Sequence, residues 1–216
     1  MRVNTDSVLL GAWTPAGNPA RILDAGTGNG LLALMAACKY PDATVDAVDI
    51  ASRALALARL NMDMNPALAR RIRLFRTDLK MFQPDHLYDM IISNPPYFDG
   101  TPPPDDLRRT ARQAGESFIR ALFELAGRHL SRDGKLYLLW PAGRRHELLD
   151  TGYRNRLFPA AEIVLRDHPQ ANVKRSLWEW TPRLGRHYRR EELILFRPDG
   201  QRTGAFDRLV KNWYLS

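Results

Sequence analysis

The sequence predicts an α/β fold: a doubly wound, Rossmann-like sheet that is mostly parallel and carries an antiparallel C-terminal edge. Three observations predict it. Short apolar runs alternate with helix-like segments over most of the chain, a glycine-rich turn directly follows the first run, and three C-terminal runs have no helices between them. Because 216 residues suffice for one full-sized core, we expect residues 1–216 to form a single domain.

The expected strands are short apolar runs, whereas the expected helices place apolar residues three and four positions apart. The first part of the chain gives strands at 21–24, 44–49, 71–76, 88–93 and 134–140, and helices at 31–40, 51–64 and 116–130. The remainder gives strands at 161–165, 176–180 and 193–196, followed by a helix at 205–213. Alternation of strands with helices produces parallel pairs, and consecutive strands produce antiparallel ones.

The chain is strongly basic, with a net charge of +8 and a sequence pI of about 10.0. This balance favours a polyanionic partner over a neutral one. No apolar run approaches the roughly 18 residues of a membrane span, and no signal segment opens the chain, so we expect a cytoplasmic protein. Nothing in the sequence indicates an obligate protein partner.

Cysteine and histidine usage predicts no metal site. Cys38 is the only cysteine, which excludes an intramolecular disulfide and a cysteine-based zinc site. It lies in an apolar helical stretch, and we expect it to be buried. The five histidines have no spacing typical of metal ligands.

Four polar loops follow four successive strands of the expected sheet, and in such sheets ligands bind at the carboxyl ends of the strands. The first is the glycine turn with Gly26, Gly28 and Gly30, preceded by Asp24. Its GxGxxA spacing alone would also fit NAD or FAD, and a tight turn without a ligand is possible. Glycines at alternate positions let a ligand approach the backbone, and Asp24 can receive an ammonium but would repel a pyrophosphate.

The next two loops each present a carboxylate. Asp49 closes the second strand, where it can accept both hydroxyls of a ribose or simply cap the following helix. Asp78 closes the third strand, where it can accept from the exocyclic amine of an adenine or belong to an ordinary turn.

The fourth loop is Asn94-Pro95-Pro96-Tyr97, directly after the apolar run at 90–93. Two prolines end the strand, because each lacks a backbone N–H and has a fixed φ. The strand end therefore presents an amide, carbonyl oxygens and an aromatic ring, which together can hold a planar primary amine. A proline-ended loop with a packed tyrosine is the alternative.

In this order, DAGTGNG at 24–30, the Asp49 and Asp78 loops and NPPY at 94–97 resemble the motifs of S-adenosylmethionine-dependent methyltransferases. More narrowly, the chain resembles the bacterial tRNA1(Val) adenine-37 N6-methyltransferase family. The segments that carry this resemblance are MRVNTDSVLLGAW at 1–13, RILDAGTGNGLLALM at 21–35, IISNPPYF at 91–98, Arg109 and Arg112 of RRTAR, and LVKNWYL at 209–215. The chain departs from the family pattern in two ways: family members usually carry a further segment before the stretch that begins here at Met1, and Asn4 stands where the family commonly has glycine.

The resemblance implies S-adenosyl-L-methionine as cofactor and tRNA as partner, with N6 of A37 in the anticodon loop of a valine tRNA as the methyl acceptor. It also implies that Thr5 and Asp6 line the methionine end of the cofactor. Asn94 and the Pro95 carbonyl would each accept one N–H of the amine, and Tyr97 would stack on the base.

Several alternatives stay open from the residues alone. A glutamine side chain in a translation factor carries the same planar NH₂, and a non-catalytic RNA-binding relative would keep the fold. DNA is less favoured, since little of the chain lies outside the expected core. Arg108, Arg109 and Arg112 can grip phosphates or form a solvated helix face. The basic segment 174–190 can form a second RNA surface, although we expect Trp178 and Trp180 to pack against a helix.

Overall fold

The computed structural model describes residues 5–95, 105–185 and 187–214, with side chains for all of these except 105–112. Its strands form one eight-stranded sheet in the order β3-β2-β1-β4-β5-β7-β6-β8. The strands are β1 (Arg21–Ala25), β2 (Thr44–Asp49), β3 (Ile72–Arg76), β4 (Tyr88–Ser93), β5 (Leu130–Pro141), β6 (Phe158–Arg166), β7 (Arg175–Thr181) and β8 (Arg189–Ile194). The prediction of a mostly parallel α/β sheet is confirmed.

The antiparallel element is β7, which pairs with β5 on one side and β6 on the other. The last strand, β8, pairs in parallel with β6 and forms the edge of the sheet. It was expected at 193–196, and that range is wrong. Its first four residues are charged and exposed, so this edge strand has no apolar pattern by which to recognise it.

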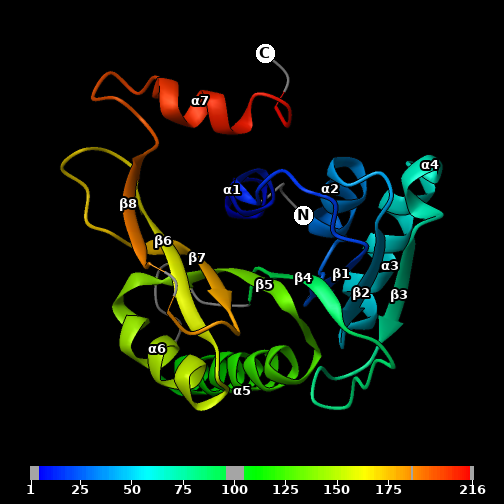
Figure 1. Ribbon diagram of the computed structural model, residues 1–216. Helices are drawn as coiled ribbons and strands as arrows, with labels where there is room; N and C mark the ends of the chain where they lie inside the picture. The colour runs from blue at the N-terminus through cyan, green and yellow to red at the C-terminus, as the bar shows by residue number, and fades with distance from the viewer. Residues whose placement is uncertain (1–4, 96–104, 186, 215–216) are drawn as a thin grey trace.

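The helices are α1 (Thr5–Trp13), α2 (Leu31–Lys39), α3 (Ser52–Asp63), α4 (Pro66–Ala69), α5 (Asp105–His129), α6 (Arg145–Arg154) and α7 (Gly204–Val210), with a short 3₁₀ turn at Ala142–Arg144. Figure 1 shows α1 and α7 on one side of strands β4–β7 and α5 and α6 on the other. The apolar core is accordingly divided into two clusters, one on each face of the sheet. Helices α1, α4 and α6 were not predicted.

Trp178 and Trp180 belong to the cluster on the α5 side and are 1% and 0% exposed. The Trp180 ring meets Phe123 of α5 edge-on at a centroid distance of 5.0 Å, and the Arg145 guanidinium of α6 lies 5.4 Å from the centre of the Trp178 ring. The expectation that these two tryptophans pack against a helix is confirmed.

Cys38, by contrast, is exposed, and the expectation of a buried cysteine is wrong. Helix α2 buries Ala33, Ala36 and Ala37 against the core. Cys38 comes directly after Ala37, and because successive helical residues are rotated by about 100°, its side chain lies outside the face that Ala33, Ala36 and Ala37 share.

Candidate active site

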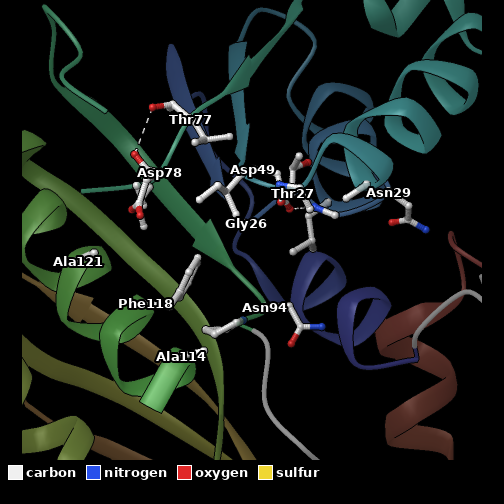
Figure 2. A pocket seen from close by; sticks show the side chains of 18 of the residues that line it. Gly26, Thr27, Asn29, Asp49, Thr77, Asp78, Asn94, Ala114, Phe118 and Ala121 are labelled. Carbon is white, nitrogen blue, oxygen red and sulfur yellow. Dashed lines mark hydrogen bonds between the residues drawn. The ribbon is translucent and has the colours of Figure 1, made fainter. Parts of the chain in front are cut away.

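The four loops predicted from the sequence meet at one cavity of about 940 Å³ at the carboxyl ends of β1–β4. Helices α1 and α5, together with the first turns of α2 and α3, supply the remaining walls. Figure 2 shows Ala114, Phe118 and Ala121 of α5 facing the strand ends that carry Asp49 and Asp78. This volume is at the upper end of ordinary ligand pockets, which leaves room for a nucleoside cofactor and part of a second substrate.

The glycine turn approaches the cavity with its backbone. Gly26, Gly28 and Gly30 all have positive φ, at 74°, 57° and 81°, a region that other residues rarely adopt. A Cβ at Gly26 would lie 2.9 Å from Cζ of Phe118, so a larger residue there would have to displace the Phe118 ring as well as adopt an unfavourable φ. Gly26 and Gly28 line the cavity, whereas Gly30 does not and instead lies close to Ala58 of α3.

Asp49 is fixed by backbone amides on both sides. Its Oδ2 accepts from the Gly28 N–H at 2.9 Å, and its Oδ1 accepts from the Ala51 N–H at 2.8 Å. Each carboxylate oxygen keeps a second acceptor site, so Asp49 can still bind ligand hydroxyls. The neighbouring Ile50 is 64% exposed and lines the same cavity, adding an apolar surface beside the carboxylate.

Asp78 lies at the exposed turn after β3 and also lines the cavity. Its Oδ1 accepts from the Lys80 N–H at 2.9 Å, which holds the turn. Leu79 follows it as an apolar lining residue. Each of the two strand ends therefore offers one carboxylate and one aliphatic side chain, a combination that suits the polar edge and flat face of a nucleoside.

Asp24 is fully buried behind the glycine turn and is not among the cavity-lining residues. Its Oδ2 accepts from the Thr27 hydroxyl at 2.6 Å, and its Oδ1 has no hydrogen-bond partner among the described residues. Burial raises the pKa of the Asp24 carboxyl from 3.8 to about 7, with a smaller upward contribution from the negative charge of Asp49. Thr27 opposes this shift by hydrogen-bonding to the charged form.

Asn94 follows β4, whose last residue is anchored by the Ser93 hydroxyl donating to the Ala25 carbonyl at 2.7 Å. The Asn94 Nδ2 donates to Ser7 Oγ at 2.9 Å. Its Oδ1 is buried and, among the described residues, has no partner. Pro95 is buried and lines the cavity beside it. Pro96 and Tyr97 lie outside the described residues.

Helix α1 brings two residues to the cavity, Asp6 and Ser7, while the half-buried Thr5 does not line it. The Asp6 Oδ1 pairs with Arg175 Nε at 2.7 Å, and Arg175 also meets Asp167 at 3.3 Å. Asp6 therefore faces the cavity as a carboxylate that is already paired with a guanidinium.

The arginines expected to bind phosphate lie in two parts of the chain, helix α5 and the basic segment 174–190. The backbone at Arg108, Arg109 and Arg112 lies in α5, and their side chains lie outside the described part of the chain. Within the basic segment 174–190, Arg183 pairs with Asp133 and Arg190 pairs with the buried Glu162.

Sequence reasoning missed Ser7, Thr27, Ile50, Leu79 and Phe118. Ile50 and Leu79 directly follow Asp49 and Asp78, so their place in the same loops could have identified them as cavity-lining residues. Phe118 comes from the middle of α5, where an apolar helical position is typical of core, and nothing local marks it as a site residue.

Two negative findings apply to the described ranges. No helix there combines the length and apolar character that crossing a bilayer requires. No three histidine, cysteine or acidic side chains in these ranges lie together in a way that could hold a metal ion.

The polar groups at the cavity are two carboxylates with aliphatic neighbours, a glycine-rich turn and the Asn94 amide oxygen. This set fits a sulfonium nucleoside such as S-adenosyl-L-methionine.

Comparison with known proteins agrees with this geometry. A family model described as methyltransferase small domain matches residues 3–156. A protein of Parabacteroides distasonis named tRNA1(Val) (adenine(37)-N6)-methyltransferase is 36% identical over 218 residues, covering 100% of this chain and 91% of that protein. A protein of the same name from Tolumonas auensis is 45% identical over 151 residues, covering 69% of this chain and 63% of that protein.

The fold is shared with a solved structure of a predicted O-methyltransferase from Agrobacterium tumefaciens. The two superpose with a TM-score of 0.76 at 18% identity over 98% of each chain. That likeness concerns the fold, whereas the sequence matches over most of the chain concern the family. On those matches, the chain belongs to the methyltransferase small-domain family and, within it, to the tRNA1(Val) (adenine(37)-N6)-methyltransferases.

Proposed function

We propose that this protein transfers a methyl group from S-adenosyl-L-methionine to the exocyclic N6 of an adenine in tRNA, with A37 of a valine tRNA as the target that its relatives' names indicate. S-adenosyl-L-methionine is the cofactor of this methyltransferase family. The observation that carries the proposal is the buried Oδ1 of Asn94, which lies at the cavity without a partner among the described residues. An acceptor left unpaired in a buried site costs about 1–3 kcal/mol, and a substrate N–H removes that cost.

Each loop would bind a different part of the cofactor. The Gly26–Gly30 turn supplies close backbone approach, Asp49 accepts the ribose hydroxyls, and Asp78 accepts the adenine amine. Asp24, buried behind the glycine turn, would receive the ammonium through water once its carboxyl is ionised. When bound, the cofactor supplies an electrophilic methyl group on a sulfonium and a neutral thioether leaving group.

The acceptor end belongs to Asn94 and Pro95. An adenine amine is a weak nucleophile, because its lone pair is delocalised into the ring. When Asn94 Oδ1 and the Pro95 carbonyl each accept one N–H, the nitrogen is biased toward a tetrahedral shape and its lone pair is oriented. With the lone pair so oriented, the methyl group would pass from the sulfonium of the bound cofactor to the nitrogen, leaving the thioether, and the surplus proton on the nitrogen would leave to water. Correct placement of the two reactants is the main contribution of the protein, and such proximity is worth several kcal/mol.

A glutamine side chain of a protein could be held by the same two acceptors. Two observations favour an adenine in tRNA over it: the net charge of +8 and the names of the relatives that match the chain. Binding a glutamine side chain would not require a strongly basic protein.

The test is to incubate the protein with isotopically labelled cofactor and total tRNA that lacks the modification, then digest the RNA and identify the labelled nucleoside. We expect the label in N6-methyladenosine, in tRNA fractions enriched for valine acceptors. Label that appears only in protein would contradict the proposal, and total ribosomal protein in a parallel reaction provides that comparison.

A further inference from the structure

Ser7, in the first turn of α1, is a polar cavity-lining side chain to which the proposed function gives no role. It lines the cavity, and its Oγ lies 2.9 Å from Nδ2 of Asn94, a residue 87 positions away in sequence. Among the described side chains, Ser7 is thus the one that hydrogen-bonds the amide to which the proposed function assigns the substrate.

Helix α1 is a firm platform for this contact. At its C-terminal end the Lys39 ammonium donates to the carbonyls of Gly11, Ala12 and Thr14, at 3.3 Å and 2.9 Å for the first two. At its first turn, Asp6 is paired with Arg175 of β7. Between these ends, Val8, Leu9 and Leu10 are buried in the core. Ser7 is therefore held at a fixed place relative to the sheet.

The contact ties one end of the Asn94 amide to helix α1, so that the other end faces the substrate. With Nδ2 donating to Ser7, the carbonyl end remains available as an acceptor. If the amide turned over, the Ser7 hydroxyl would have to donate to Oδ1, and Nδ2 would face the substrate amine. Two donors cannot hydrogen-bond each other, so that orientation could not hold the amine. Methyl transfer to an amine thus needs the orientation observed.

We propose that Ser7 is a positioning residue: its hydroxyl accepts from Asn94 Nδ2 and keeps Oδ1 directed toward the amine that is methylated. This inference rests on the proposed function, because the acceptor role of Asn94 is part of it. Ser7 acts through Asn94 and takes no proton from the substrate.

The first experiment compares Ser7→Ala and Ser7→Thr with the wild type under steady-state conditions. Ser7→Ala should lower kcat about fivefold, the scale of one neutral hydrogen bond, and leave KM for tRNA and the cofactor Kd within about twofold. Ser7→Thr keeps the hydroxyl and should restore most of kcat. Unchanged kcat in Ser7→Ala, or a loss that follows cofactor Kd and thermal stability instead, would overturn the inference.

A second comparison uses Asn94→Asp, whose two carboxylate oxygens are equivalent acceptors, so that turning the group over changes nothing. Ser7→Ala should then cost less than twofold when it is combined with Asn94→Asp. An equal loss in both backgrounds would mean that Ser7 acts elsewhere. If Asn94→Asp is too slow to measure even with excess enzyme, the Ser7→Thr result decides.

A spectroscopic readout separates this inference from the function on which it rests. The side-chain amide protons of Asn94 in ¹H–¹⁵N spectra should exchange slowly in the wild type and in Ser7→Thr, and faster in Ser7→Ala. Unchanged exchange in Ser7→Ala would refute the contact whatever the substrate is. Slow exchange with no transfer to tRNA would instead contradict the proposed substrate and leave the contact supported.

Discussion

The burial of Asp24 makes a sharp prediction about pH. Its carboxyl pKa is about 7 in the folded protein and 3.8 when unperturbed, so the folded state binds the extra proton between these values. A buried carboxyl with a raised pKa therefore costs stability as pH rises, and the free energy of unfolding falls across this window. From pH 5 to pH 8 the two pKa values give a loss of roughly 2.5 kcal/mol from this group alone.

Asp24→Asn removes the titration while keeping the size of the side chain. Urea unfolding of the cofactor-free protein at several pH values between 5 and 8 measures the effect. The wild type should lose about 2.5 kcal/mol more than the variant over this range, since the other ionisable groups cancel in the comparison. The same variant should bind the cofactor more weakly above pH 7, because the ionised carboxylate that would receive the ammonium is gone.

Thr27→Val is the matched variant for this prediction. The Thr27 hydroxyl donates to Asp24 Oδ2 and lowers the carboxyl pKa, so its loss should move the pH transition upward without abolishing it. If the difference in the free energy of unfolding between wild type and Asp24→Asn is the same at every pH from 5 to 8, the reasoning is refuted. Asp24 would then be charged in the folded protein throughout this range.

Three further predictions concern packing and binding. Gly152→Ala should lower the free energy of unfolding by about 1–3 kcal/mol, because a Cβ there would lie 2.2 Å from the Trp180 ring; an unchanged urea midpoint would contradict this. Lys39→Met should cost about 1–3 kcal/mol in the same assay by leaving the carbonyls at the end of α1 without their donor, and a more stable variant would count against that role. Asp49→Ala should weaken cofactor binding at least tenfold in titration calorimetry, the scale of one lost charge-assisted hydrogen bond, and a Kd equal to that of the wild type would exclude Asp49 as a ligand.

The parallel part of the sheet could be predicted because its strands are buried and read as apolar runs between helices. The same pattern located Asp49, Asp78 and Asn94, since a polar residue at the end of a buried strand is conspicuous. Cavity lining by these three residues follows from parallel strand geometry, in which carboxyl ends share one edge.

Other features depend on tertiary structure and gave no local signal. Helix α1 has apolar residues in succession at 8–10, all buried, so no single apolar face identifies it as a helix. The Ser7–Asn94 contact joins segments 87 residues apart, and no local pattern reports such a pairing. Strand β8 is a charged edge, which resembles a loop in sequence.

The central claim is that Asn94 binds the amine that receives the methyl group and does not bind the cofactor. The most direct measurement is the single-turnover rate of methyl transfer to unmodified tRNA by Asn94→Ala, made alongside its cofactor Kd. Asn65→Ala, which removes an exposed amide outside the cavity lining, is the matched control. We predict a loss of transfer of about a hundredfold or more with a cofactor Kd within about threefold of the wild type, on the scale of a removed transition-state hydrogen bond. Transfer at the wild-type rate, or an equal loss of transfer and cofactor binding, would contradict the claim.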